Sequence, residues 1–214
     1  MSAIIIGILG LQGDFLEFSE GLYRNCEILE QECEARLVTT HADLEELDGL
    51  IIPGGESTVI GQLMLKTRDE EKKESLLDAI KTRIGNGMPT LGVCAGAILL
   101  AKNIRDINLG EISQPRLGTL DMEVLRNSYG RQNLSFEAQL NYPTDPDHNE
   151  TGVFIRSPRI LATGPEISVL AEMNQETVAV QKENQFASTF HPELEHESLI
   201  LKRFIETIAT TKTN

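Results

Sequence analysis

The sequence predicts an α/β protein built on a doubly wound, mostly parallel sheet with flanking helices. Two observations favour this class. Short apolar runs rich in β-branched residues alternate with segments of helical spacing through the first half of the chain. These runs are apolar at nearly every position, as parallel strands are when helices cover both faces of their sheet. The length of 214 residues suits a single domain spanning residues 1–214.

The first half alternates strands and helices in the order that a doubly wound sheet requires. A turn follows the first run, Asp14 is placed to cap the next helix, and a charged stretch at 66–74 exceeds what the fold needs. We expect strands at 3–10, 34–39, 49–52 and 88–93, and helices at 15–32, 43–47, 57–65, 97–101 and in a segment ending near 85–87.

The second half changes character, because additional short strands are joined there by turn-rich segments. A polar loop is expected at 141–151, and residues 103–116 are interpreted as an extended connection. We expect strands at 120–126, 135–140, 152–155, 169–173, 177–181 and 186–190, and an amphipathic helix at about 197–210.

Composition excludes several classes of function. Nineteen basic and 33 acidic residues give a net charge of −14, so no basic excess exists to neutralise nucleic-acid phosphates or an anionic membrane. No signal peptide, membrane span or metal-ligand cluster is recognisable. Three scattered cysteines form no disulfide framework, and Cys26 and Cys33, seven apart, could share a helix face as core residues. We expect a cytoplasmic protein without a cofactor.

The segment Leu91-Gly92-Val93-Cys94-Ala95-Gly96 is the most informative stretch. It is typical of a buried strand that turns sharply into a helix and lifts one side chain out of the sheet edge. Glycines two residues either side avoid a clash in so tight a bend, and the backbone N–H groups of the helix start favour a thiolate. Cys94 is therefore a candidate nucleophile. The alternative is a small, buried apolar cysteine.

A cysteine nucleophile needs a base and a group that orients the base. Of the four histidines, His41 is better explained as a helix cap, and His148 and His196 lie in polar or acidic runs. His191 directly follows a strand, and in an extended segment it would share a face with Glu193. The carboxylate would then fix the tautomer of the imidazole. The alternative is a strand end with two exposed polar residues.

Pro53-Gly54-Gly55-Glu56-Ser57 follows the third strand at the carboxyl end of the sheet, where doubly wound folds bind ligands. The backbone N–H groups of Gly55 and Ala95 are candidates for an oxyanion hole. The alternative is a tight turn with Ser57 as a helix cap. The spacing and the lysine of a phosphate-binding loop are absent.

Together, Gly-Gly-Glu-Ser, Gly-x-Cys-x-Gly and His-Pro-Glu resemble the class I, or triad, glutamine amidotransferases. Further segments resemble the glutaminase subunits of pyridoxal 5′-phosphate synthase, and this resemblance spans nearly the whole chain. The segments are residues 7–13, 53–58, 126–132 (Arg-Asn-Ser-Tyr-Gly-Arg-Gln) with 135–137, 152–158 (Gly-Val-Phe-Ile-Arg-Ser-Pro) and 188–194.

The resemblance implies roles for particular residues. Cys94 would be the nucleophile, His191 the general base and acid, and Glu193 the partner that orients it. The resemblance makes L-glutamine the substrate, and Arg126 and Glu56 could then bind its α-carboxylate and α-ammonium. The residues that would line the glutamine pocket are Gly55, Glu56, Ser57, Arg126, Ile155 and Arg156.

The implied function is hydrolysis of L-glutamine to glutamate and ammonia, with the ammonia delivered to a synthase subunit that makes pyridoxal 5′-phosphate. Two alternatives stay open. One is a glutaminase for another acceptor, or a free-standing Cys-His hydrolase of γ-glutamyl compounds. The other is a non-catalytic α/β interaction module. The stretches at 66–74 and 103–116 depart from a compact version of the family pattern and bear on how a partner docks.

Overall fold

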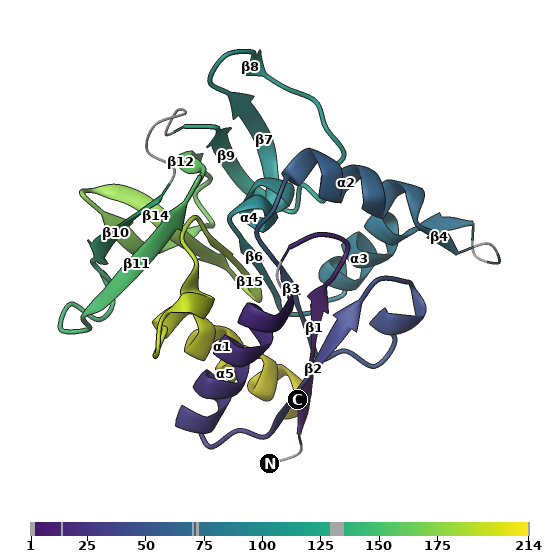
Figure 1. Ribbon diagram of the computed structural model, residues 1–214, viewed down its shortest axis with the longest axis horizontal. Helices are drawn as coiled ribbons and strands as arrows, with labels where there is room; N and C mark the ends of the chain where they lie inside the picture. The colour runs from purple at the N-terminus through teal and green to yellow at the C-terminus, as the bar shows by residue number, and fades with distance from the viewer. Residues whose placement is uncertain (1–2, 14, 70, 72, 129–134, 214) are drawn as a thin grey trace.

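A computed structural model describes residues 3–13, 15–69, 71, 73–128 and 135–213. Its centre is a seven-stranded sheet in the order β13-β14-β15-β6-β3-β1-β2 (Figure 1). The five strands from β15 to β2 run parallel, and β14 and β13 are antiparallel additions at one edge. The strands are β1 (Ile4–Leu9), β2 (Cys33–Val38), β3 (Gly49–Ile52), β6 (Thr90–Val93), β13 (Ser168–Met173), β14 (Glu176–Lys182) and β15 (Gln185–Ser188).

Helices cover both faces of this sheet, which confirms the predicted fold class. On one face, α1 and α5 contact each other and pack with the hairpin of β10 and β11. On the other face, α2 packs against α3 and α4, and α4 also contacts a second sheet in the order β12-β9-β7-β8. The helices are α1 (Phe15–Ile28), α2 (Ser57–Lys66), α3 (Leu76–Gly85), α4 (Ala95–Leu100) and α5 (Leu199–Thr213).

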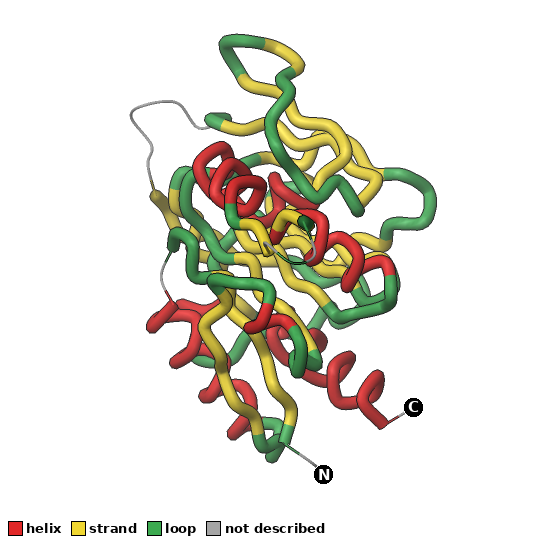
Figure 2. Tube along the Cα trace, turned by 90° about the vertical axis from the view of Figure 1, so that its right-hand side faces the viewer, coloured by secondary structure: helices red, strands yellow, loops and turns green. Residues whose placement is uncertain are grey.

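The second sheet corrects the expectation for residues 103–116. Strand β7 (Ala101–Asp106) pairs in parallel with β9 (Leu120–Arg126), and β8 (Gly110–Glu111) folds back on β7. Strand β12 (Arg159–Thr163) was not expected either, and it pairs with β9. Figure 2 shows these strands above the central layer. The remaining strands are β10 (Ser135–Leu140), β11 (Glu150–Ile155) and the short hairpin β4 (Arg68–Asp69) with β5 (Glu74–Ser75).

Several local expectations need correction. Helix α1 ends at Ile28, so Cys33 lies in β2 and does not share a helix face with Cys26. His41 precedes a short 3₁₀ turn, η1 (Ala42–Leu44), but its side chain caps nothing there. The carboxylate of Asp43 instead accepts hydrogen bonds from the backbone and hydroxyl groups at residues 39 and 40. The cap expected at Asp14 lies outside the described residues.

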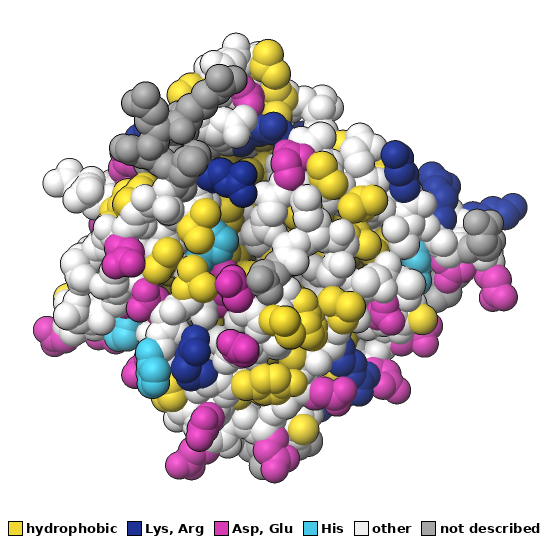
Figure 3. Space-filling model, viewed as in Figure 1, with side chains coloured by type: hydrophobic (Ala, Val, Ile, Leu, Met, Phe, Trp, Pro, Cys, Tyr) yellow, Lys and Arg dark blue, Asp and Glu magenta, His cyan; other side chains and the backbone are white. Residues whose placement is uncertain are grey.

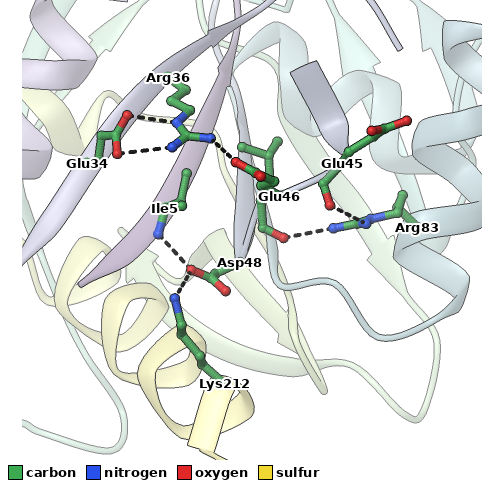
Figure 4. Close-up of polar contacts among 9 residues, drawn as sticks. Ile5, Glu34, Arg36, Glu45, Glu46, Asp48, Arg83 and Lys212 are labelled. Carbon is green, nitrogen blue, oxygen red and sulfur yellow. Dashed lines mark hydrogen bonds and ion pairs between the residues drawn. The ribbon is translucent and has the colours of Figure 1, made fainter. Parts of the chain in front are cut away.

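The amino ends of the central strands are closed by polar contacts (Figure 4). Asp48 accepts hydrogen bonds from the backbone amide of Ile5 and from Nζ of Lys212, both at 2.7 Å. Lys212 also reaches the carbonyl of Ala3, which places the two ends of the chain side by side, as Figures 1 and 2 show. A ligand is therefore expected at the opposite edge of the sheet, where the parallel strands have their carboxyl ends.

None of the described helices has the length and apolarity to cross a bilayer.

Candidate active site

Cys94 occupies the turn between β6 and α4 in a left-handed backbone conformation (φ 53°). Such strain is costly for a non-glycine residue and gathers at functional sites. A Cβ on Gly96 would lie 2.0 Å from the carbonyl oxygen of Ile52, and one on Gly92 would lie 2.6 Å from that of Gly96. Both positions therefore need glycine. The resulting turn holds a cysteine that is 7% exposed.

His191 and Glu193 come from the turn that follows β15. This turn is a short 3₁₀ helix, η2 (Pro192–Leu194), rather than the extended segment expected from the sequence. It still brings Nδ1 of His191 to 2.7 Å from Oε1 of Glu193. A carboxylate only accepts hydrogen bonds, so Nδ1 carries the hydrogen of this contact. The other ring nitrogen, Nε2, is then left for a reacting group.

The side chains of His191 and Cys94 both lie next to Gly54. An ideal Cβ on Gly54 would lie 3.7 Å from Nε2 of His191 and 3.6 Å from Cβ of Cys94. Burial by itself would lower the pKa of His191, but the contacts with Cys94 and Glu193 outweigh it and raise the pKa to about 10. Nε2 makes no hydrogen bond of ordinary geometry within the described part of the chain. The contacts with Cys94 and Glu193 therefore favour the charged form of the ring, and Nε2 keeps hydrogen-bonding capacity for a substrate.

Helix α1 holds the Glu193 segment from behind. Nη2 of Arg24 donates to the carbonyl oxygens of Glu193 (2.9 Å) and Glu195 (3.0 Å), and its Nε donates to that of His196 (3.2 Å). A Cβ on Gly21 would lie 2.6 Å from the carbonyl oxygen of Glu193. The helix backbone and the turn are thus in direct contact, and Glu193 is only 3% exposed.

The structure gathers nine of the ten predicted site residues around one cavity of about 150 Å³. This volume is below the range of pockets for drug-sized molecules and suits a small ligand. The tenth residue, Glu193, lies behind His191. The predicted residues that line the cavity are Gly55, Glu56, Ser57, Cys94, Ala95, Arg126, Ile155, Arg156 and His191.

The loop after β3 forms one wall of the cavity. Gly55 has φ +143°, which an L side chain rarely adopts, and Oε1 of Gln12 accepts a hydrogen bond from the backbone amide of Glu56 (2.9 Å). The alternative of a helix cap at Ser57 is wrong, because the carboxylate of Glu56 caps α2 by accepting from two backbone amides of its first turn. Glu56 is thereby fixed beside the cavity.

Arg126 enters from the end of β9 and is restrained on several sides. Its Nη1 donates to Oγ1 of Thr58 (2.7 Å) and to Oε1 of Gln114 (2.9 Å). Its Nε lies 3.2 Å from Oδ2 of Asp106, and Nη2 lies 3.8 Å from Oε1 of Glu56. The guanidinium is therefore placed next to the carboxylate with which the sequence paired it.

Backbone with unusual geometry forms another part of the cavity wall. Sγ of Cys94 lies 3.8 Å from the carbonyl oxygen of Ile155, to which the thiol donates a weak hydrogen bond. Arg156 and Asn127 line the same cavity, and both have positive φ, at 47° and 58°. Together with Cys94, three strained non-glycine residues therefore surround one small space.

Sequence reasoning missed the residues that support this site. Gln12, Asp106 and Gln114 act through contacts with residues far along the chain, which no local pattern displays. Asp106 would have been found had β7 been recognised as a neighbour of β9. Residues 129–132 of the Arg-Asn-Ser-Tyr-Gly-Arg-Gln segment lie outside the described residues. Within the described residues, no group of His, Cys, Asp and Glu could hold a metal ion.

Solved structures share this architecture. A crystal structure of a glutamine amidotransferase matches with a TM-score of 0.78 and 37% identity, covering 95% of this chain and 98% of that one. A glutamine amidotransferase from Thermotoga maritima matches with a TM-score of 0.57 at 13% identity, covering 100% of this chain and 93% of that one, which speaks to the fold alone. The protein therefore has the glutamine amidotransferase fold.

Sequence comparison narrows the class. A family model described as the SNO glutamine amidotransferase family matches residues 8–210. A curated protein of Nitrosopumilus maritimus, named pyridoxal 5′-phosphate synthase subunit PdxT, is 42% identical over 97% of this chain and 98% of its own. One of the same name from Sulfolobus acidocaldarius is 38% identical over 95% and 98%. The chain belongs to the SNO glutamine amidotransferase family.

Proposed function

We propose that this chain is the glutaminase subunit of a pyridoxal 5′-phosphate synthase, in which Cys94, His191 and Glu193 hydrolyse L-glutamine. Relatives named pyridoxal 5′-phosphate synthase subunit PdxT match nearly the whole chain, and they support the proposal that the partner is a synthase subunit. The single observation that carries the chemistry is the meeting of Cys94 and the His191–Glu193 pair at one cavity.

The first half of the reaction forms a thioester. The thiolate of Cys94 attacks the side-chain amide carbon of glutamine, and the oxygen becomes an oxyanion held by the backbone N–H groups of Gly55 and Ala95. The C–N bond then breaks, and the imidazolium of His191 gives its Nε2 proton to the departing ammonia. Glu193 keeps the ring oriented and stabilises its charge through Nδ1.

The second half restores the enzyme. His191, now neutral, removes a proton from a water molecule, and the oxygen of that water attacks the thioester carbon. The S–C bond breaks, glutamate leaves, and the thiolate–imidazolium pair is regenerated. A raised pKa suits His191 for this cycle, because the ring must be charged when ammonia leaves.

The pocket selects an amino acid through two opposite charges. Arg126 would take the α-carboxylate and Glu56 the α-ammonium, with Ser57, Ile155 and Arg156 closing the walls. The acidic side chains on the face shown in Figure 3 are spread among basic and apolar ones. Recognition of the substrate therefore depends on the charges of individual pocket residues.

Ammonia is mostly protonated near neutral pH and is then no nucleophile, so the product is useful only when it passes directly to a synthase subunit. We further propose that the chain works in the cytoplasm, where its cysteines Cys26, Cys33 and Cys94 stay as free thiols.

The test is ammonia release from L-glutamine, measured with and without the synthase subunit of the same organism. We expect slow hydrolysis by the chain alone, clear acceleration by the synthase, and none with Cys94→Ala. Cys33→Ala, which removes a thiol away from the cavity, is the matched control and should keep full activity. Equal rates with and without the synthase argue against coupling. Preference for γ-glutamyl peptides over glutamine indicates a free-standing hydrolase instead.

A further inference from the structure

Arg126 lies close to a carboxylate with which it could form a tighter ion pair. Its Nη2 is 3.8 Å from Oε1 of Glu56, and both residues line the small cavity above Cys94. Opposite charges this close attract each other, although the side chain of Glu56 is 46% exposed and water weakens the attraction. If the guanidinium moved onto Glu56, each would neutralise the other, and the pocket would lose both of the charges that match an amino acid.

Asp106 binds the guanidinium of Arg126 from another side, at a shorter distance than Glu56 does. Strands β7 and β9 run parallel with Asp106 opposite Arg126 in the register, so both side chains leave the same end of the second sheet. Asp106 is 6% exposed, and its Oδ2 lies 3.2 Å from Nε of Arg126. Thr58 and Gln114 bind Nη1. Two of the three nitrogens are therefore held by these partners, and Nη2 is the one that lies near Glu56.

Asp106 is itself fixed. Its Oδ1 accepts a hydrogen bond from the backbone amide of Asn108 (2.9 Å), and its Oδ2 accepts from Nδ2 of Asn127 (2.8 Å). The amide of Asn108, then the side chain of Asn127 and the charge of Arg126 lower the pKa of Asp106 despite its burial. All of these partners are donors, so only a charged carboxylate satisfies the site.

We propose that Asp106 is a positioning residue for substrate recognition: it keeps the guanidinium of Arg126 at a long, 3.8 Å contact with Glu56, so that both charges can bind the α-carboxylate and α-ammonium of glutamine. This inference rests on the proposed function and adds a residue to which neither the motifs nor the comparisons assign a role. It requires that loss of Asp106 weakens substrate binding while the cysteine chemistry stays intact.

Asp106→Asn is the discriminating variant. An asparagine keeps the shape, but its NH₂ group must face a donor, Asn108 N on one side or Asn127 Nδ2 and Arg126 Nε on the other. Because charge-assisted hydrogen bonds are the strong ones, we expect KM for glutamine to rise about tenfold or more, with kcat changed less than about threefold. Asp106→Glu keeps the charge and should recover part of the binding.

The matched control is Glu123→Gln. Glu123 also pairs with an arginine across β7 and β9, since its Oε1 lies 2.5 Å from Nε of Arg105, but this pair does not line the cavity. Its KM should match that of the wild type. Thr58→Val removes a second anchor of Arg126 without touching Asp106 and should raise KM in the same direction.

A labelling experiment separates failure of this inference from failure of the proposed function. A diazoketone analogue of glutamine carries the α-amino acid group, whereas iodoacetamide does not, and both alkylate a reactive thiol. We expect Asp106→Asn to slow labelling of Cys94 by the analogue about tenfold and to leave labelling by iodoacetamide unchanged. Saturable labelling of the wild type with equal rates in Asp106→Asn overturns the positioning role alone. A wild type without saturable labelling by the analogue overturns the proposed function and the inference together.

Discussion

The packing of α1 against the Glu193 turn offers a sensitive test, because the two backbones leave no space for an added side-chain atom. A Cβ placed on Gly21 would lie 2.6 Å from the carbonyl oxygen and 2.9 Å from Cα of Glu193. Ordinary van der Waals contact starts at 3.4 Å, so Gly21→Ala forces the helix and the turn apart by roughly 0.8 Å. Both nearby atoms are backbone, which cannot rotate away.

The expected cost follows from two opposing effects. Overpacking costs about 1–3 kcal/mol of unfolding free energy, and replacing glycine by alanine inside a helix returns up to about 1 kcal/mol. The net loss is therefore about 0–3 kcal/mol. The effect on turnover should be larger, because a misplacement of about 1 Å in a catalytic group can cost on the order of 100-fold in rate.

The assay combines thermal unfolding with glutamine hydrolysis in the presence of the synthase. Gly85→Ala is the matched control, since Gly85 also lies in a helix and a Cβ there meets nothing within 4 Å. It should leave turnover unchanged and raise stability slightly. Gly21→Ala with wild-type turnover would refute the argument that α1 sets the position of Glu193.

Three further predictions concern charge and hydrogen bonds. The pKa of His191 is about 10 in the folded protein against an ordinary 6.5, so its stabilising effect is complete below about pH 6.5 and disappears towards pH 10. The stability gap between wild type and His191→Gln should therefore narrow over this window in chemical denaturation, and a constant gap contradicts the pairing. Arg24→Gln removes three hydrogen bonds to the Glu193 turn and should lower kcat more than it changes KM, while an unchanged kcat would deny it this role. Asp43→Ala removes the acceptor of the backbone amides of residues 39 and 40, which are remote from the cavity, and should cost about 0.5–1.5 kcal/mol in unfolding free energy with turnover intact; a loss of turnover in the folded variant would contradict this prediction.

The sequence predicted the inner strands of the central sheet well because they are buried on both faces. Strands β1, β3 and β6 are continuous apolar runs, and this pattern alone identifies them. Strand β7 was missed because Ala-Lys-Asn-Ile-Arg-Asp is exposed at three of its six positions and belongs to the second sheet. Charged and polar residues interrupt its apolar pattern, so the pattern does not indicate a strand.

The residues of the candidate site also differ in whether local sequence alone could reveal them. Cys94 could be singled out from local residues, because the glycines around a sharp turn leave a mark in the sequence. The order His-Pro-Glu indicated the pair of His191 and Glu193, although the turn that joins them is helical and not extended. Arg126 needed the family resemblance. Asp106 needed the structure, since its pairing depends on the register of two strands.

The most direct measurement is a search for the acyl intermediate. The protein and its synthase are mixed with L-glutamine, quenched in acid, and the peptide that contains Cys94 is weighed by mass spectrometry. We predict a glutamyl thioester on Cys94 and no ammonia release by Cys94→Ala. Ammonia release that persists in Cys94→Ala, or an acyl group found on another residue, contradicts the assignment.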